Sequence, residues 1–241
     1  MALFKYIAGF FLSIRTAVWS LGILILLLLA GAFIMPVRQE FQSLHSVPLF
    51  AWLPQQSPSV SWWLWLSIGA LAVLSMNTVV CSIDSLIKKR GSAQWLLLIS
   101  PQVIHIGFLF ILLAHLLSGV GSAQGVGVAR EGTSFMLYED NTVLLVKSID
   151  IRTDPYGYVS DWEVGVEYTS DGKTVSDRIR PNSPSLYKGL NVNVKDLQAA
   201  PEKAVLLQIS RDPGAVWALA GGMLFMVGIL TLAALKIRAD K

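Results

Sequence analysis

The chain has 241 residues, of which 54% are hydrophobic and 15% are charged, and its mean hydropathy is +0.57. Soluble domains carry roughly 25% charged residues, so this composition excludes a protein that lies wholly in the cytosol. The single cysteine, Cys81, excludes an internal disulfide, a CxxC redox pair, a cysteine-rich zinc site and a CxxCH haem-attachment sequence. The net charge of +3 comes from basic residues scattered at the ends of hydrophobic segments, which indicates membrane topology and no nucleic-acid partner.

Four apolar segments are each long enough to cross a bilayer, which takes about 20 residues. The first segment follows Arg15 and contains 22 residues without a charge. Amphipathic rings concentrate at the bilayer interface, and three tryptophans at the start of the second segment suit that place: Trp62, Trp63 and Trp65. We predict membrane helices at about residues 16–36, 61–83 and 102–120, and a fourth helix with a cytoplasmic tail in residues 213–241.

A signal peptide is an alternative for the first segment, because Ala30, Gly31 and Ala32 resemble a small-residue cleavage site. The apolar run continues through Met35, so we favour a membrane helix.

The distribution of basic residues predicts the orientation, because lysine and arginine are in excess on the cytoplasmic side. If the N-terminus is cytoplasmic, the short outer loop holds only Arg38. The cytoplasmic side then holds eight basic residues: Lys5, Arg15, Lys88, Lys89, Arg90, Lys236, Arg238 and Lys241. We therefore expect both termini in the cytoplasm and residues 122–212 outside the membrane.

Residues 122–212 have a different composition, with a net charge of −3 against +6 for the rest of the chain. Apolar and polar residues alternate at 163–168 and 190–195, and Val143, Leu145, Ile149 and Ile151 indicate another strand. Turn sequences separate these runs, at 154–157, 170–173 and 182–184. The predicted fold class is a membrane protein in which a small all-β extracytoplasmic domain, a sandwich or a barrel, lies between transmembrane helices three and four. The predicted domains are thus residues 1–121, 122–212 and 213–241.

Two histidines, His105 and His115, lie on the predicted third span, where an ionisable side chain is costly and usually faces a partner or a cofactor. Their ten-residue separation corresponds to about 15 Å of rise and about 80° of rotation on a helix, so one iron atom cannot bind both. Each histidine either binds haem or forms a hydrogen bond to a neighbouring helix. Haem ligation is the more plausible for His105, which lies about one turn beyond Pro101.

Other polar residues carry weaker indications of chemistry. His45 lies in the outer loop, where a histidine without a ligand role is the default, although a loop at the membrane surface could reach haem. Asp84 precedes Lys88 closely enough to pair with it, and Cys81 is more often a packing residue than a reactive thiol. Asp212 and Pro213 suit the cap and first position of the fourth helix.

Short motifs along nearly the whole chain resemble the ResB (CcsB) family of cytochrome c maturation proteins, which act in the system II pathway. The most specific are Asn182-Ser183-Pro184, Tyr187-Lys188-Gly189 and Asp212-Pro213-Gly214 in that order. The others are Phe11-Leu12-Ser13-Ile14-Arg15 before the first span, His105-Ile106-Gly107 in the third and Glu131-Gly132 at the start of the outer domain.

The resemblance implies a subunit that works with a CcsA/ResC-type membrane protein to handle haem and present it to apocytochrome c. It implies that His105 is the membrane ligand of a b-type, transiently bound haem iron, and it identifies no catalytic residue. The chain would be at most a non-autonomous subunit of a cytochrome c haem lyase in the bacterial inner membrane. A thioredoxin-like thiol reductase and membrane lipids are further implied partners. The short outer domain leaves open a specialised role that serves one cytochrome.

Two other functions are compatible with the residues. A b-haem electron-transfer subunit of a membrane respiratory complex needs paired axial histidines, and two histidines on one helix cannot close such a site. A structural assembly factor would use the β domain to bind a protein, and its histidines would only pack.

Overall fold

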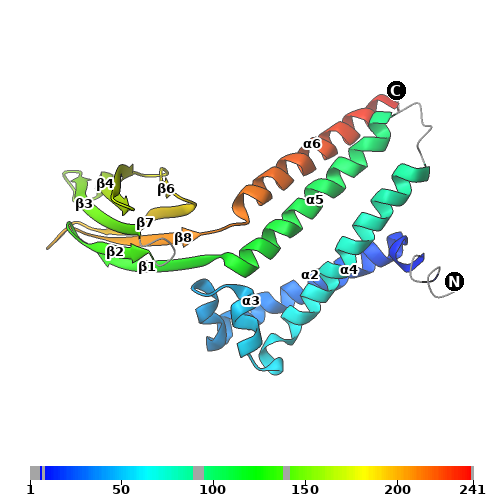
Figure 1. Cartoon of the computed structure of the whole chain (residues 1–241), viewed down its shortest axis with the longest axis horizontal. Helices are drawn as coiled ribbons and strands as arrows, with labels where there is room; N and C mark the ends of the chain where they lie inside the picture. The colour runs from blue at the N-terminus through cyan, green and yellow to red at the C-terminus, as the bar shows by residue number, and fades with distance from the viewer. Residues whose placement is uncertain (1–5, 7–8, 89–94, 138–141, 240–241) are drawn as a thin grey trace. The chain divides into compact units, whose positions relative to one another are not determined.

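The computed structural model describes residues 6, 9–88, 95–137 and 142–239. The chain forms two compact units, one made of Met1–Gly121 with Pro213–Lys241 and the other of Ser122–Asp212. Among the described residues of the first unit, four helices are long and apolar enough to cross a membrane (Figure 1). They are α2 (Ile14–Ile34), α4 (Pro58–Lys88), α5 (Trp95–Gly121) and α6 (Ala215–Ala239). The predicted fold class is confirmed, since the strands all lie between the third and fourth of these helices.

The second and third membrane helices are longer than the apolar spans predicted for them. α4 has 31 residues and begins at Pro58, where the carbonyl of Ser57 accepts the first helical hydrogen bonds. Proline suits this first position, because its missing N–H has no partner there in any helix. At the other end, Asp84 and Lys88 pair at 2.9 Å, as predicted. Four of the predicted cytoplasmic basic residues lie outside the described residues: Lys5, Lys89, Arg90 and Lys241.

The segment between α2 and α4 is folded rather than an open loop. It consists of the 3₁₀ turns η1 (Met35–Val37), η2 (Gln39–His45) and η3 (Leu53–Gln55) and the short helix α3 (Leu49–Trp52). Trp52 is buried, and its Nε1 donates to the carbonyl of Glu40 at 3.1 Å and to Ser43 Oγ at 3.0 Å. Trp63 packs into the same apolar cluster, whereas Trp62 and Trp65 are exposed.

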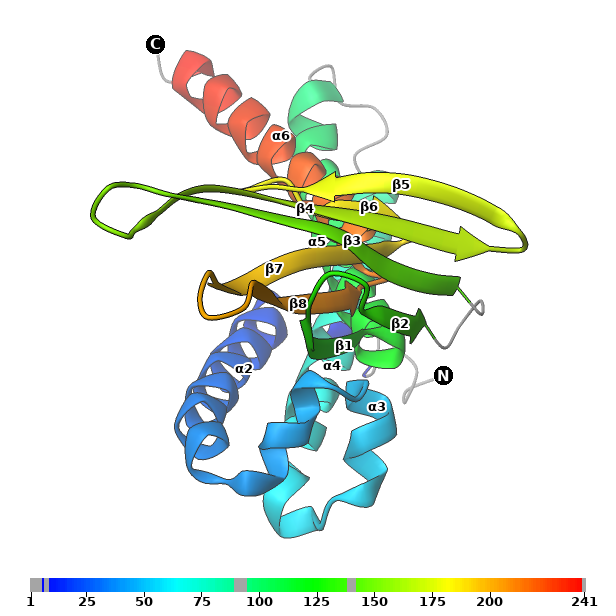
Figure 2. The same ribbon diagram turned by 90° about the vertical axis from the view of Figure 1, so that its left-hand side faces the viewer.

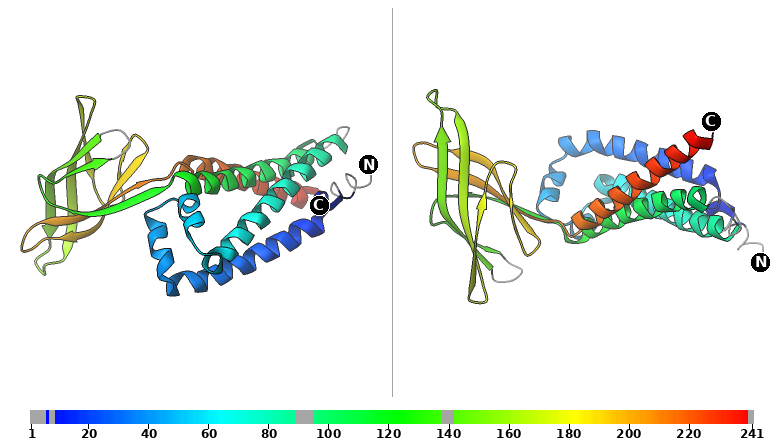
Figure 3. Two further views of the ribbon diagram at one scale, coloured as in Figure 1. Left: turned by 60° about the horizontal axis from the view of Figure 1, so that its bottom comes forward. Right: turned by 90° about the horizontal axis from the view of Figure 1, so that it is seen from above.

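Small residues at seven-residue spacing hold α5 against α6, and the two helices run side by side in both views of Figure 3. A Cβ atom added to Gly107 would lie 2.5 Å from the backbone nitrogen of Phe225, and one added to Gly221 would lie 2.7 Å from the carbonyl of Gly107. The interface between the two helices, the α5–α6 seam, contains three such close contacts, and the helices run antiparallel. The contacts join Ser100 to Gly228, Gly107 to Gly221 and Ala114 to Gly214. Small residues let helix backbones approach closely in membranes.

The start of α6 differs from the prediction. The helix begins at Ala215, and the carbonyl of Gly214 accepts a hydrogen bond from the amide of Ala218 at 2.9 Å, so Gly214 is the N-cap. Pro213 therefore precedes the helix and is not its first residue. Gly214 is required here because any side chain would collide with the carbonyl of Ala114 on α5.

The second unit is a sandwich of two four-stranded antiparallel sheets (Figure 2). One sheet has the order β1-β8-β7-β6 and the other β2-β3-β4-β5. The strands are β1 (Ala123–Ala129), β2 (Ser134–Leu137), β3 (Thr142–Thr153), β4 (Val159–Ser170), β5 (Lys173–Ile179), β6 (Ser185–Tyr187), β7 (Leu190–Gln198) and β8 (Ala204–Arg211). Residues from both sheets form one buried core, among them Val164, Val166, Val192 and Leu207.

Strand β3 is present as predicted, but a bulge changes which of its residues face the core. Before the bulge the buried residues are Leu144 and Val146, and after it Ile149, because the pairing with β4 shifts between Val146 and Ser148. Glu131 accepts a hydrogen bond from the amide of Ile149 at 2.8 Å. Glu131 therefore binds the strand just after the bulge.

Candidate functional site

His105 lies on α5, one turn after Pro101, and is partly buried. Its Nδ1 is 2.7 Å from Oγ of Ser82 on α4, so this contact links the two consecutive helices α4 and α5. The other ring nitrogen, Nε2, has no hydrogen-bond partner among the described residues. The sequence predicted either haem ligation or a hydrogen bond to a neighbouring helix for His105. In the structure Nδ1 makes the hydrogen bond, and Nε2 is the nitrogen that could bind iron.

A cavity of about 440 Å³ lies beside His105, within the membrane unit. α5 contributes Gln102 and His105, α4 contributes Asn77, Cys81 and Asp84, and the start of α2 contributes apolar residues. Its volume falls within the range of about 300–1,000 Å³ that is usual for small-molecule sites.

Gln102 is the most informative residue of this cavity that the sequence analysis missed. Its side chain is 7% exposed, yet its Oε1 has no hydrogen-bond partner within the described structure. Burying an amide oxygen without a partner costs about 1–3 kcal/mol, so such groups usually meet water or a ligand. No sequence signal marks Gln102 except its position three residues before His105 on a helix, where the two share a face.

Asn77 and Cys81 have structural partners. The Nδ2 of Asn77 donates to the carbonyls of Phe11 and Ser13, at 2.7 and 3.1 Å. These carbonyls lie where the chain is not helical, at residues 12–13, just before α2. Cys81 Sγ lies 3.5 Å from the carbonyl of Phe11. Asn77 therefore ties α4 to the backbone just before α2.

The other two histidines lie elsewhere. His115 is on the same helix, ten residues further on, and its side chain is exposed. His45 lies at the end of η2, and its side chain is outside the described residues. The structure therefore does not bring His115 to the cavity beside His105.

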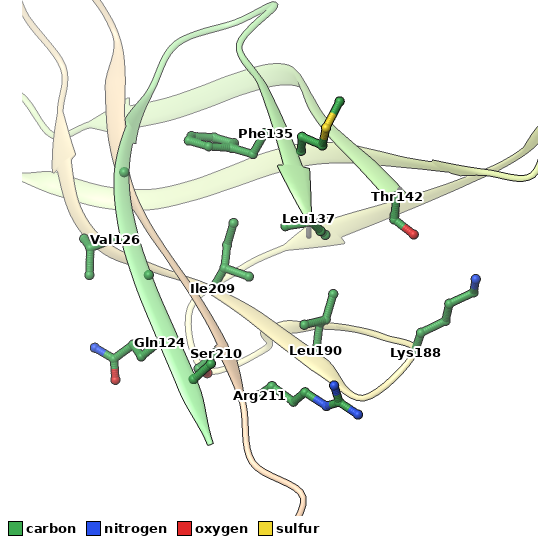
Figure 4. A pocket seen from close by; sticks show the side chains of 14 residues that line it. Gln124, Val126, Phe135, Leu137, Thr142, Lys188, Leu190, Ile209, Ser210 and Arg211 are labelled. Atoms are coloured by element: carbon green, nitrogen blue, oxygen red, sulfur yellow. The ribbon is translucent and has the colours of Figure 1, made fainter. Parts of the chain in front are cut away.

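The β domain has a second hollow, of about 410 Å³, which Figure 4 shows from close by. Its apolar lining comes from Phe135, Leu137, Leu190 and Ile209, and β1 contributes small residues such as Gly125. No histidine or cysteine lines it, so it offers neither of these ligands to an iron atom.

The donor set in the membrane cavity fits one axial bond to haem iron. A neutral imidazole is a common haem ligand, and its second nitrogen usually donates a hydrogen bond to a fixed acceptor, a place that Ser82 fills for His105. Leu97, Leu98 and Pro101 provide apolar lining. Among the described residues, no group of three or more His, Cys, Asp or Glu side chains could hold a metal ion by itself.

Comparison with known proteins assigns no family. No protein-family profile matches the chain, and no curated protein matches it. The chain is similar to a solved structure of the cytochrome c haem lyase CcmF, at 14% sequence identity over 88% of this chain, with a TM-score of 0.45. It spans about a third of that protein, 34% of its length. A likeness at this level carries no statement about function.

Proposed function

We propose that this chain is a ResB-type subunit of cytochrome c maturation in which His105 supplies one axial ligand to a transiently bound b-type haem. A CcsA/ResC-type membrane protein would share the haem, an apocytochrome c would receive it, and a thioredoxin-like thiol reductase would keep the acceptor cysteines reduced. The proposed setting is the bacterial inner membrane, with both termini cytoplasmic and the β domain on the outer side. The chain has no catalytic residue of its own in this proposal.

The structural roles of the residues in the ResB-like motifs support the proposal. Most of them have structural tasks that need no ligand. The carbonyls of Phe11 and Ser13 accept from Asn77, and Gly107 packs against α6. In the β domain Glu131 accepts a hydrogen bond from the amide of Ile149, and Asn182 adopts a positive φ of 58° in a tight turn.

His105 is the motif residue whose second nitrogen the fold leaves unused. It lines a cavity that Gln102 also lines, and the Oε1 of Gln102 is buried without a hydrogen-bond partner among the described residues. This combination is the observation that carries the proposal, because a packing histidine would have its polar atoms satisfied by neighbouring helices.

Bound haem would supply the iron and the vinyl groups to which cysteine thiols add. The chain's own contribution is to hold and orient. His105 would present one ring nitrogen while Ser82 fixes the other, and the seam between α5 and α6 would keep His105 at a constant position. The β domain would bind the apocytochrome or the outer loops of the partner.

Exchange of His105 for alanine tests the proposal. The full chain would be purified together with its CcsA-type partner, and the haem content and the Soret absorption would be measured for wild type and His105→Ala. We expect the variant to lose most of the haem associated with this chain, or to show a shifted Soret band, because one axial bond to iron is missing.

His115→Ala is the matched control, since it removes a histidine from the same helix outside the cavity. It should leave both the haem content and the spectrum unchanged. Equal haem content and identical spectra in wild type and His105→Ala would reject the assignment and favour a scaffold without haem contact.

A further inference from the structure

Three groups form a hydrogen-bonded chain from α4 to α5. Ser82 Oγ donates to the carbonyl of Thr78 at 2.7 Å, and the same oxygen lies 2.7 Å from Nδ1 of His105. Thr78 is buried, so its carbonyl is within the helix bundle rather than in contact with water. Both contacts have the length of ordinary strong hydrogen bonds to a hydroxyl group.

The number of protons decides the direction of each bond. A serine hydroxyl has one proton to donate and can accept through its lone pairs. The carbonyl of Thr78 has no proton and can only accept. If Ser82 gives its proton to Thr78, the proton between Ser82 and His105 must belong to Nδ1 of the histidine.

We infer that Ser82 is a positioning residue that holds His105 in the tautomer with the proton on Nδ1 and a lone pair on Nε2. This inference rests on the proposed function for its meaning, because only the bare nitrogen of an imidazole can bind iron. In water the neutral imidazole of histidine prefers its proton on Nε2. Ser82 therefore reverses an intrinsic preference and prepares His105 for ligation.

Among the described residues, Ser82 is the side chain that is hydrogen-bonded to the ring of His105. Of the polar side chains that line the cavity, Asp84 pairs with Lys88 and Asn77 donates to the carbonyls before α2. Gln102 makes no hydrogen bond through its Oε1. Among the described residues, the ring of His105 is thus fixed through Ser82 alone.

The tautomer can be measured without haem. The full chain would be labelled with ¹⁵N in its histidine rings and studied in detergent, in a background with His45→Asn and His115→Gln so that only His105 gives a signal. We expect a protonated Nδ1 in the wild-type sequence and in Ser82→Thr, which keeps the hydroxyl group. Ser82→Ala should move the proton to Nε2.

Ser85→Ala is the matched control, because Ser85 is on the same helix and lines the same cavity. It should leave the tautomer unchanged. A proton on Nε2 in the wild-type chain, or the same tautomer in Ser82→Ala as in wild type, would overturn the inference.

A second measurement separates this inference from the proposed function. Hemin would be titrated into the complex of the chain with its partner, and we expect Ser82→Ala to weaken binding by about 10- to 100-fold, as is typical when the hydrogen-bond partner of a metal-bound histidine is removed. Rescue by Ser82→Thr would support the positioning role. If Ser82→Ala changes the tautomer while His105→Ala leaves haem binding intact, the role of Ser82 in positioning stands and the proposed function fails.

Discussion

Tyr168 is the largest side chain that is wholly buried, and a short polar network in the β domain depends on it. Its hydroxyl donates to Ser185 Oγ at 2.7 Å, and Ser185 Oγ donates to a carboxylate oxygen of Asp177 at 2.5 Å. The ring stacks on Tyr187, with 4.4 Å between the ring centroids. Burial raises the pKa of Tyr168 to about 12, and the charge of Asp177 adds to this effect. These contacts link strands β4, β5 and β6.

Tyr168→Phe should destabilise the β domain at neutral pH by about 1 kcal/mol, because one buried hydrogen bond is lost. For a domain of this size that corresponds to about 4–8 °C in melting temperature. Because the pKa of Tyr168 is higher in the folded than in the unfolded state, its contribution is complete below pH 10 and is lost as the pH rises through about 12. This loss amounts to about 3 kcal/mol. Calorimetry of the full chain in detergent should therefore show a deficit in the variant at pH 7 that shrinks or reverses near pH 12.

A constant deficit of the variant across that pH range would contradict the assigned pKa. Tyr156→Phe serves as the control, because its side chain is exposed at the turn between β3 and β4 and should change neither value.

At the residue scale, the sequence identified His105 because a histidine in an apolar run is conspicuous. It did not identify Ser82 or Gln102. Serine is unremarkable in a membrane helix, and the contact between Ser82 and His105 depends on how α4 and α5 pack, which no local pattern contains. The three-residue spacing of Gln102 and His105 was visible, but whether Gln102 is buried was not.

At the scale of elements, the α5–α6 seam shows that a spacing of small residues in one helix does not reveal which residues of another helix it contacts. The sequence contains Gly214, Gly221 and Gly228 at seven-residue spacing, but only the structure shows that they match Ser100, Gly107 and Ala114 on α5. A repeat of seven keeps small residues on one face of a helix over several turns. By contrast, alternating apolar residues were enough to predict β4 and β7, whereas the same kind of pattern did not reveal the bulge in β3.

Two neighbouring glycines allow a sharp test of this seam. A side chain at Gly221 would meet the backbone of α5, whereas one at Gly222 would meet nothing within 4 Å. We expect Gly221→Leu to separate the helices and to lower the melting temperature of the detergent-solubilised chain, because overpacking costs about 1–3 kcal/mol or more. Gly222→Leu should melt like the wild type. Equal melting temperatures of the two variants would show that α5 and α6 do not pack through this face.

At the scale of the whole molecule, the number of spans constrains where each part lies. If α2, α4 and α5 all cross the bilayer, the β domain must lie opposite to the N-terminus, and the crossing of α6 returns the C-terminus to the starting side. The number of spans determines only which parts of the chain share a side of the membrane. The basic residues decide which side is the cytoplasm, since Lys88, Lys236 and Arg238 would then share the side that favours positive charge.

Labelling with a membrane-impermeant maleimide tests both parts of that argument. In a Cys81→Ser background, single cysteines would replace Tyr156 in the β domain and Ile237 near the end of α6, both of which are exposed. On intact spheroplasts we expect labelling of Tyr156→Cys alone, with Ile237→Cys labelled only after lysis. The reverse pattern would invert the orientation while keeping the number of spans. Labelling of both variants on intact spheroplasts would mean that α6 does not return the chain across the membrane, because an even number of crossings must separate two sites on the same side.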